Sequence, residues 1–398
     1  MNTKNRRVII LILGLLSAIA PFSIDMYLPG FPAIAKSFNI TTAQVTLSLS
    51  SFFIGISLGQ IVYGPLLDRF GRKKPLYAGL LLYLIATAGC YFAPSIEILI
   101  GLRFIQAIGS CAAGVVSMAM VRDFFPPNEN AKIFSLLLLV LGVSPMIAPS
   151  IGGIIVADFG WKAIFIALFL LVVIVLLIAY FFLPESRQAD QSYTIKAKPI
   201  LQGYWQILKN PQFITYAIGG SIAFSGLFAY ISDSPVIFME GYGISNKAYG
   251  WIFAILSIGL VGAGQFNRLF AKYFKPEEIV IGAISSMIII GSILFFGLSQ
   301  HWFGMIGTIV CIFLFLGCIG ISNPNAAALS MAPFEKNAGS AASLFGFLQW
   351  GTAGLSSVVV SYFKSKTPIP LAVFMVGSAL LAFVILYIGN RAIKNQEI

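Results

Sequence analysis

The chain has 398 residues, of which 58% are hydrophobic and only 10% are charged, and its mean hydropathy is +0.92. Soluble domains carry about 25% charged residues, so this composition excludes a soluble protein and indicates an integral membrane protein. The net charge of +11 does not imply binding to nucleic acid, because basic loops facing anionic lipid account for it and no basic cluster is interleaved with aromatic residues.

Helices are the expected membrane-spanning elements. About twelve apolar stretches reach the length of about 20 residues that a spanning helix needs, and alternating strand patterns are absent. The first six expected spans are, to within a few residues, 8–27, 45–66, 75–92, 96–121, 133–156 and 161–183. The second six are 213–239, 249–270, 279–298, 302–331, 338–363 and 371–388. We therefore predict an all-α integral membrane protein with two pseudo-symmetric six-helix bundles, 1–183 and 212–398, joined by a polar cytoplasmic linker, 184–211.

Basic residues set the expected orientation. Most of the 25 Lys and Arg residues fall in segments on the side of the N-terminus, and cytoplasmic loops are the ones that carry such an excess. We therefore expect both termini in the cytoplasm. A cleaved signal peptide ending near Ala20 is the alternative for the N-terminus, and it would leave an odd number of spans.

The first expected span holds a carboxylate near its far end, Asp25. A charged residue in hydrocarbon costs about 2.5–3.5 kcal/mol, so its presence implies a task, most simply the carriage of protons or cations. At 1.5 Å per residue Asp25 lies about 26 Å from the inner end of its span. We predict that it binds the coupling proton and that Met26 and Tyr27 face the substrate cavity.

The loop between the second and third spans contains the ordered string Gly64-Pro65-Leu66-Leu67-Asp68-Arg69-Phe70-Gly71-Arg72-Lys73-Lys74. Its glycines permit close helix approach and a tight reversal, and its acid can cap a helix or pair with an Arg. For the basic run alone, a purely topogenic loop is the alternative. The whole string resembles the cytoplasmic signature loop of the major facilitator superfamily. The resemblance implies a latch that holds the two bundles in the outward-open state, formed by Gly64, Asp68, Arg69, Gly71 and Arg72.

The fourth span contains a second embedded charge, Arg103. It lies about 10 Å from the outer end of its span, so we expect it at a depth similar to that of Asp25 and opposite it. Gln106 and Ser110 share its face and offer hydrogen bonds to a cavity, and Met118 offers an adaptable apolar wall. The surrounding string resembles the superfamily's buried-arginine motif. The alternative is that Arg103 only pins the fourth span to backbone carbonyls of the first.

The fifth span combines prolines and glycines in a pattern that favours kinking and tight packing. Ordinary membrane helices also contain these residues, which is the alternative. The pattern is similar to the motif typical of antiporters in the same superfamily, although Ser144 stands where exporters often carry Gly. The resemblance implies a hinge or seal formed by Gly142, Pro145, Pro149, Gly152 and Gly153.

The second half echoes the first at an offset of about 200 residues, which is typical of transporters built from parallel repeats. Gly59, Gly64 and Arg72 align with Gly259, Gly264 and Lys272. The second-half candidates for the cavity wall are polar or aromatic residues in three spans: Tyr230, Asp233, Asn323, Asn325, Gln349 and Trp350. For Asp233 the alternative is a solvated position near the outer mouth.

The resemblance covers essentially the whole chain. The opening string Ser-Ile-Asp-Met-Tyr-Leu-Pro, the following Phe-Pro pair and the string 230–235 resemble the bicyclomycin and chloramphenicol resistance branch, Bcr/CflA. This implies proton-driven export of drug-like small molecules across the bacterial inner membrane. We expect a functional monomer in contact with lipid, with protons as the coupling ion and no other cofactor. The four Cys lie within spans and lack metal-ligand spacing, so no metal site is expected.

Two alternatives stay open. One is a proton-coupled transporter of a single metabolite, such as a sugar or an amino-acid derivative, on the same scaffold. The other is a membrane-embedded enzyme or receptor, for which the sequence offers no plausible catalytic set, since the only histidine is His301 in an expected outer loop.

Overall fold

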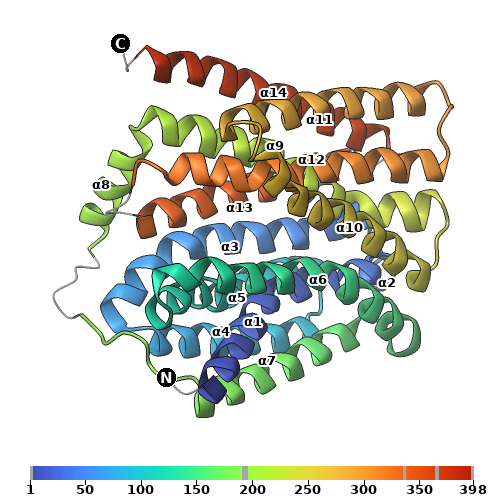
Figure 1. Ribbon diagram of the computed structural model, residues 1–398. Helices are drawn as coiled ribbons and strands as arrows, with labels where there is room; N and C mark the ends of the chain where they lie inside the picture. The colour runs from blue at the N-terminus through green and yellow to red at the C-terminus, as the bar shows by residue number, and fades with distance from the viewer. Residues whose placement is uncertain (1–2, 191–195, 335–337, 364–366, 396–398) are drawn as a thin grey trace.

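The computed structural model describes residues 3–190, 196–334, 338–363 and 367–395, and all regular structure in these ranges is helical. The long helices lie side by side, and both ends of the chain lie at the same end of the bundle (Figure 1). Within the described ranges, twelve helical spans are long and apolar enough to cross a membrane. The predicted all-α membrane fold with about twelve spans is therefore confirmed.

The helices before residue 183 occupy the lower part of Figure 1 and those after residue 211 the upper part. We call these groups the N-terminal and C-terminal halves. The N-terminal half consists of α1 (Thr3–Asp25), η1 (Leu28–Gly30), α2 (Phe31–Phe38), α3 (Thr42–Phe70), α4 (Lys73–Phe92), α5 (Ile96–Phe124), α6 (Pro127–Phe159) and α7 (Lys162–Phe182). The C-terminal half consists of α9 (Pro211–Pro235), η2 (Val236–Gly241), α10 (Asn246–Phe270), α11 (Pro276–Ser299), α12 (Met305–Met331), α13 (Ala338–Tyr362) and α14 (Ile369–Lys394).

Short polar residues and glycines mark where several of these helices begin and end. Thr41 caps α3 in a capping box with Gln44, and Ser95 and Asn210 accept hydrogen bonds from the first turns of α5 and α9. Gly71 ends α3 with a φ of +79°, a conformation that residues with a Cβ rarely adopt. The reversal between α3 and α4 predicted at this glycine is present.

Two segments differ from their sequence expectation. The expected linker contains a helix, α8 (Ala197–Leu208), which packs Tyr204 and Ile207 against Phe213 of α9; residues 191–195 of that linker lie outside the described part of the chain. The first expected span ends as an α-helix at Asp25 and continues through η1 into α2. Pro29 has no N–H to donate, which favours ending the regular helix before it.

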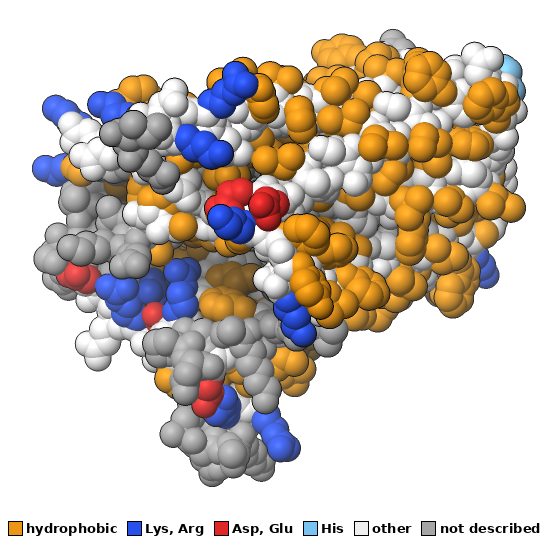
Figure 2. Space-filling model, turned by 45° about the horizontal axis from the view of Figure 1, so that its top comes forward, with side chains coloured by type: hydrophobic (Ala, Val, Ile, Leu, Met, Phe, Trp, Pro, Cys, Tyr) orange, Lys and Arg blue, Asp and Glu red, His pale blue; other side chains and the backbone are white. Residues whose placement is uncertain are grey.

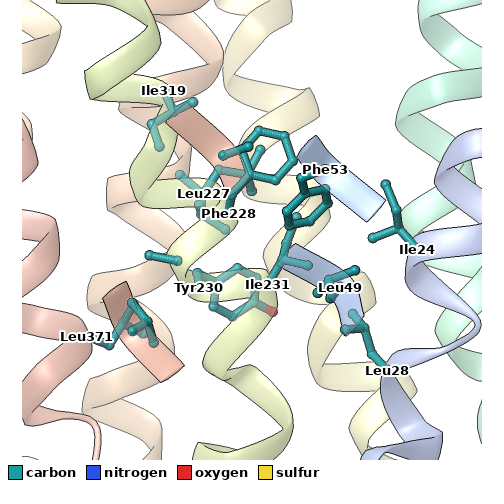
Figure 3. Close-up of a cluster of buried hydrophobic side chains, with 14 of the residues drawn as sticks. Ile24, Leu28, Leu49, Phe53, Leu227, Phe228, Tyr230, Ile231, Ile319 and Leu371 are labelled. Atoms are coloured by element: carbon teal, nitrogen blue, oxygen red, sulfur yellow. The ribbon is translucent and has the colours of Figure 1, made fainter. Parts of the chain in front are cut away.

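The two halves meet along two helix pairs, α3 with α13 and α6 with α10. Small residues allow the close approach. A Cβ at Gly354 of α13 would lie 2.6 Å from Ile54 of α3, and a Cβ at Gly250 of α10 would lie 2.7 Å from Ser150 of α6. The largest hydrophobic core cluster includes residues of both halves, so the interface is continuous with the core (Figure 3).

Candidate functional site: a pathway between the two halves

Arg103 of α5 is fully buried, and its surroundings lie within the N-terminal half. Its guanidinium donates to Gln106 Oε1 at 2.6 Å and to the Ser23 carbonyl of α1 at 2.9 Å. It also lies over the rings of Tyr27 and Phe52, 4.4 and 4.2 Å from their centroids. Such contacts hold a buried cation in place without an acid. This geometry agrees with the alternative in which Arg103 holds the fourth span to the first, because its guanidinium joins α5 to a backbone carbonyl of α1.

Neighbouring polar groups extend this cluster. Gln106 Nε2 donates to Thr87 Oγ1 at 2.7 Å, and Ser23 Oγ lies 2.6 Å from the Tyr83 hydroxyl, which ties α1, α4 and α5 together. Gln106 and Ser110 are fully buried, and Ser110 donates to the Ala107 carbonyl of its own helix. In this conformation the expected cavity face of α5 is therefore packed inside the N-terminal half.

Asp25 is 3% exposed and lies at the last residue of α1. Within the described part of the chain, no hydrogen bond or cation reaches its carboxylate, and the expected opposition to Arg103 does not form an ion pair here. Asp25 instead lies in the neighbourhood of Tyr230 and Tyr249, without a hydrogen bond to either in the described part of the chain. These tyrosines belong to α9 and α10, so the acid faces the boundary between the halves.

The residues after Asp25 turn toward the N-terminal half. Met26 belongs to a core cluster with residues of α6 and α7, and Tyr27 donates or accepts a hydrogen bond of 2.8 Å with Ser48 of α3. Both side chains are buried. Although we expected them to face substrate, they are packed in this conformation.

Tyr230 is 2% exposed, and no partner for its buried hydroxyl is found among the described residues. Its ring stacks on Phe253 with centroids 5.6 Å apart, and its oxygen points into the space between α9 and the N-terminal helices (Figure 3). Asp233, one turn further along α9, is 8% exposed, so in this conformation it is buried and not solvated. η2 follows α9 directly, and its buried residues cover this end of the helix.

Hydroxyl contacts close the end of the molecule opposite the termini. Ser50 Oγ lies 2.6 Å from Ser357 Oγ, and Ser232 donates to Ser357 at 2.8 Å, which joins α3, α13 and α9. Thr46 of α3 donates to the Ser232 carbonyl at 3.4 Å. A further hydrogen bond joins Thr42 to Glu240 of η2. We call this set the outer hydroxyl cluster: Thr42, Thr46, Ser50, Ser232, Glu240 and Ser357.

An aromatic cluster fills the centre of the interface. Phe53 of α3 contacts Phe228 of α9 with ring centroids 4.8 Å apart, and Trp350 of α13 lies 5.1 Å from Phe228 (Figure 3 shows the two phenylalanines). Trp350 was a predicted wall residue, whereas the two phenylalanines could not be told from the many others in the sequence. Large flat rings that meet across the halves offer surfaces for aromatic compounds once the halves move apart.

Amide side chains of the C-terminal half form two pairs between neighbouring helices of that half. Gln349 donates to Asn323 at 2.8 Å, and Asn325 donates to Asn267 at 2.8 Å. Gln349 and Asn323 are half-buried, as is Met118 of α5. The sequence analysis named Met118, Asn323, Asn325 and Gln349 as candidates and missed Asn267.

A cavity of about 840 Å³ opens at the end that carries both termini. Figure 2 shows a hollow on this end with Lys and Arg side chains beside it. Its walls come from α3, α5, α8 and α13, with Asp68, Arg72, Asp123 and Arg187 among the charged residues. The predicted latch residues Gly64, Asp68 and Arg72 line it, and the predicted substrate-wall residues do not. The molecule is therefore open at this end and closed at the other.

The latch residues form a charged network with residues of the N-terminal half and of the start of the linker. Arg72 Nε donates to Asp123 at 2.8 Å, and Asp68 Oδ1 lies 3.4 Å from both Arg72 and Arg187. Burial opposes the charge of Arg72, but the hydrogen bonds and charges of Asp123 and Asp68 outweigh it and raise the pKa of Arg72 above its ordinary value. Arg69 is half-buried next to this network in the chain.

A backbone contact completes the network. Glu185 accepts hydrogen bonds from the backbone N–H groups of Arg72 and Lys73, at 2.9 and 3.1 Å, at the start of α4. Sequence reasoning missed Asp123, Glu185 and Arg187. Their positions in the sequence could have indicated them, since they are among the first charged residues after the fourth and sixth spans.

The predicted hinge residues lie on α6, whose prolines are inside the helix. A Cβ at Gly142 would lie 2.9 Å from Val261 of α10, and one at Gly153 would lie 2.5 Å from the Asn246 carbonyl. Gly152 faces the backbone of Met26, where a Cβ would collide. These glycines let α6 contact both α10 and the end of α1. Pro145 and Pro149 lie between Gly142 and Gly152 along the helix.

Comparison with known proteins gives the family context. A sequence profile described as Major Facilitator Superfamily matches residues 13–358. An uncharacterized MFS-type transporter, YdgK, of Bacillus subtilis is 31% identical, covering 95% of this chain and 94% of that protein. A bicyclomycin resistance protein homolog of Haemophilus influenzae is 29% identical and covers 99% of both chains.

A multidrug resistance protein, MdtL, of Citrobacter koseri is 30% identical over 83% of this chain and 82% of that protein. Among solved structures, a D-xylose-proton symporter superposes with a TM-score of 0.74 at 16% identity, covering 94% of this chain and 97% of that one. At that identity the likeness concerns the fold alone.

Proposed function

Because the chain belongs to the Major Facilitator Superfamily, we propose that it exports small amphipathic compounds in exchange for protons. Membership makes it a multi-pass membrane transporter of small molecules and not an enzyme. Relatives named for bicyclomycin resistance and for multidrug resistance, similar over most of their length, support drug-like compounds as the substrate class.

Asp25 carries the proposal of proton coupling. A carboxylate that is 3% exposed and has no cation or hydrogen-bond donor among the described residues is stable only when neutral, and so with a proton bound. It lies at the boundary between the halves, near Tyr230 and Tyr249 of the C-terminal half. Parting of the halves at the end opposite the termini would admit water to the carboxyl, and closure would remove the water again. A site whose hydration alternates in this way can take up a proton on one side and release it on the other.

The conformational cycle follows from this geometry. With the outer end open, Asp25 takes a proton from outside, which allows the buried closed state to form. With the inner end open, as in this structure, Asp25 is still buried and keeps its proton. A compound that enters between the halves, where Trp350 and the amide pairs supply stacking and hydrogen bonds, brings water to the carboxyl, and the proton then leaves to the cytoplasm. Each proton that enters is worth about 2.3 kcal/mol per 100 mV of membrane potential.

The proposal includes the setting of the protein. We place it in the bacterial inner membrane as a monomer in contact with lipid, with both termini and α8 in the cytoplasm, because basic residues concentrate at that end. The cavity of about 840 Å³ then opens to the cytoplasm, and the conformation is inward-facing. This is the state in which an exporter receives its cargo.

Purified protein in liposomes tests the coupling. We expect drug transport driven by a pH gradient, and we expect Asp25→Asn to reduce that transport severalfold while leaving drug binding largely intact. The matched control is Glu97→Gln, which neutralises an exposed acid at the same outer end of the molecule. Undiminished pH-driven transport in the Asp25 variant removes this residue from the mechanism.

A susceptibility panel separates multidrug export from transport of one metabolite. The protein would be expressed in an exporter-depleted bacterial host and tested with and without a protonophore. Lower sensitivity to several unrelated compounds, lost with the protonophore, is the expected result. A change confined to one nutrient analogue would favour the metabolite alternative, which the shared fold of the D-xylose-proton symporter keeps physically reasonable.

A further inference from the structure

The first helix of each half ends with a buried acid. Asp25 is the last residue of α1, and Asp233 lies two residues before the end of α9 at Pro235. In a fold built from two parallel repeats, α1 and α9 are equivalent elements. Asp233 therefore lies near the same end of the first helix of its half as Asp25 does.

The two acids also share an environment that is costly for a charge. Asp233 is 8% exposed, and among the described residues its carboxylate has no hydrogen-bond donor and no cation. The ionisable side chains around this end of α9 are Tyr230 on α9 itself, Tyr249 of α10 (which bonds to Ser234), Glu240 and Tyr242 in and after η2, and Asp25 beyond the two tyrosines, and none of them is positive. Lys247, at the start of α10, lies 3.9 Å from Asp158 instead.

The contacts on both sides of Asp233 belong to the closed outer end. Ser232 donates to Ser357 at 2.8 Å and accepts from Thr46 of the N-terminal half. Ser234 lies 2.6 Å from the Tyr249 hydroxyl. If the halves part at this end, the contact between Thr46 and Ser232 breaks and water reaches the adjacent carboxyl. Asp233 therefore alternates between hydrated and buried states for the same geometric reason as Asp25.

We propose that Asp233 is a second proton-binding carboxyl, the counterpart of Asp25 in the C-terminal half, and that each transport cycle carries two protons. Each carboxylate takes one proton from water at the open outer end, stays neutral while it is buried, and gives up its proton to water that enters from the inner end with the exported compound. Export of one neutral compound then moves two positive charges inward. This inference rests on the proposed proton-coupled export.

The experiment measures stoichiometry in liposomes with the membrane potential clamped at zero. At balance, the logarithm of the ratio of a neutral drug across the membrane rises with the pH difference, with a slope equal to the number of coupled protons. We expect a slope of about two for the unmodified protein, about one for Asp233→Asn, and about zero when Asp25→Asn is added. Asp233→Glu should restore about two, and Glu97→Gln should leave the slope unchanged.

The outcomes separate the two proposals. A slope of zero in the unmodified protein overturns proton-coupled export itself. A slope of one in the unmodified protein, or a slope that Asp233→Asn does not change, overturns the second site alone, including the case in which only the affinity for cationic drugs changes. If Asp233→Asn does not fold, infrared spectra of Asp25→Asn at neutral pH decide: a remaining buried protonated carboxyl band supports the second site, and its absence overturns it.

Discussion

Arg103 and Asp25 are both buried in the N-terminal half, yet the chain surrounds them differently. The arginine has two hydrogen bonds and two aromatic rings about it, all from its own half. Among the residues that the structure describes, none supplies such a contact to the aspartate, and its neighbours Tyr230 and Tyr249 belong to the other half. Arg103 Nε has no acceptor among the described residues, but the remaining hydrogen bonds of the guanidinium tie α5 to α1. A buried charge held in this way joins helices, whereas a buried carboxylate without partners depends on a proton and on the position of the opposite half.

The largest expected effect comes from breaking the Arg103 cluster. Arg103→Met leaves Gln106 Oε1 and the Ser23 carbonyl without their donor, so we expect a loss of about 3–5 kcal/mol in the free energy of unfolding. Asp25→Asn removes no contact and should leave this stability nearly unchanged. Thermal unfolding of both variants in one detergent makes the comparison. An Arg103→Met protein as stable as the unmodified chain, but inactive, would assign Arg103 to transport and not to structure.

The next effect concerns the charged network at the inner end. Asp68→Asn weakens the ion pairs with Arg72 and Arg187, and because Asp68 is partly exposed we expect a change of about 1 kcal/mol or less in stability. Since the resemblance assigns the latch to the outward-open state, conformational cycling should slow severalfold while drug affinity stays nearly the same. Stopped-flow fluorescence measures cycling, and Glu97→Gln is again the control. Equal cycling rates would contradict a latch at Asp68.

The smallest effect concerns the outer hydroxyl cluster. Ser50→Ala and Ser357→Ala each remove one partner of a buried hydrogen bond of 2.6 Å, and their coupling in a double-mutant cycle should be about 0.5–1.5 kcal/mol. The closed outer end should then be a few-fold less populated, as measured by the accessibility of a single cysteine introduced at that end. Ser286→Ala, an exposed hydroxyl on α11, is the matched control. Additive effects with no coupling would show that this contact does not hold the outer end closed.

The sequence predicted the architecture well because hydrocarbon imposes one length scale on every span. It also predicted Asp25 as a buried acid, since a carboxylate in an apolar run has few explanations. The sequence could not predict which face of each helix packs against which neighbouring helix. The depth of Arg103 suggested a partner in Asp25, whereas the rotation of α1 turns that acid toward α9. Depth follows from residue number, but rotation follows from packing, which one sequence does not specify.

The candidate wall residues show the same limit. Gln106 and Ser110 share a face of α5, as their spacing requires, but the face points into the N-terminal half. Asp123, Glu185 and Arg187 act together because three separate chain segments meet at the inner end. Their partnership depends on tertiary contacts between residues over 50 positions apart.

Pro65 has a consequence for the linker between the halves. Since a proline has no N–H, the Ile61 carbonyl one turn earlier in α3 lacks its usual helical donor. The Tyr204 hydroxyl of α8 supplies that donor at 3.3 Å, so a side chain of the linker completes a hydrogen bond that Pro65 leaves open in α3. When the two halves tilt against each other, either this hydrogen bond breaks or α8 moves together with α3. The linker helix α8 therefore changes its contact with α3 whenever the tilt between the two halves changes, and it does more than tether them.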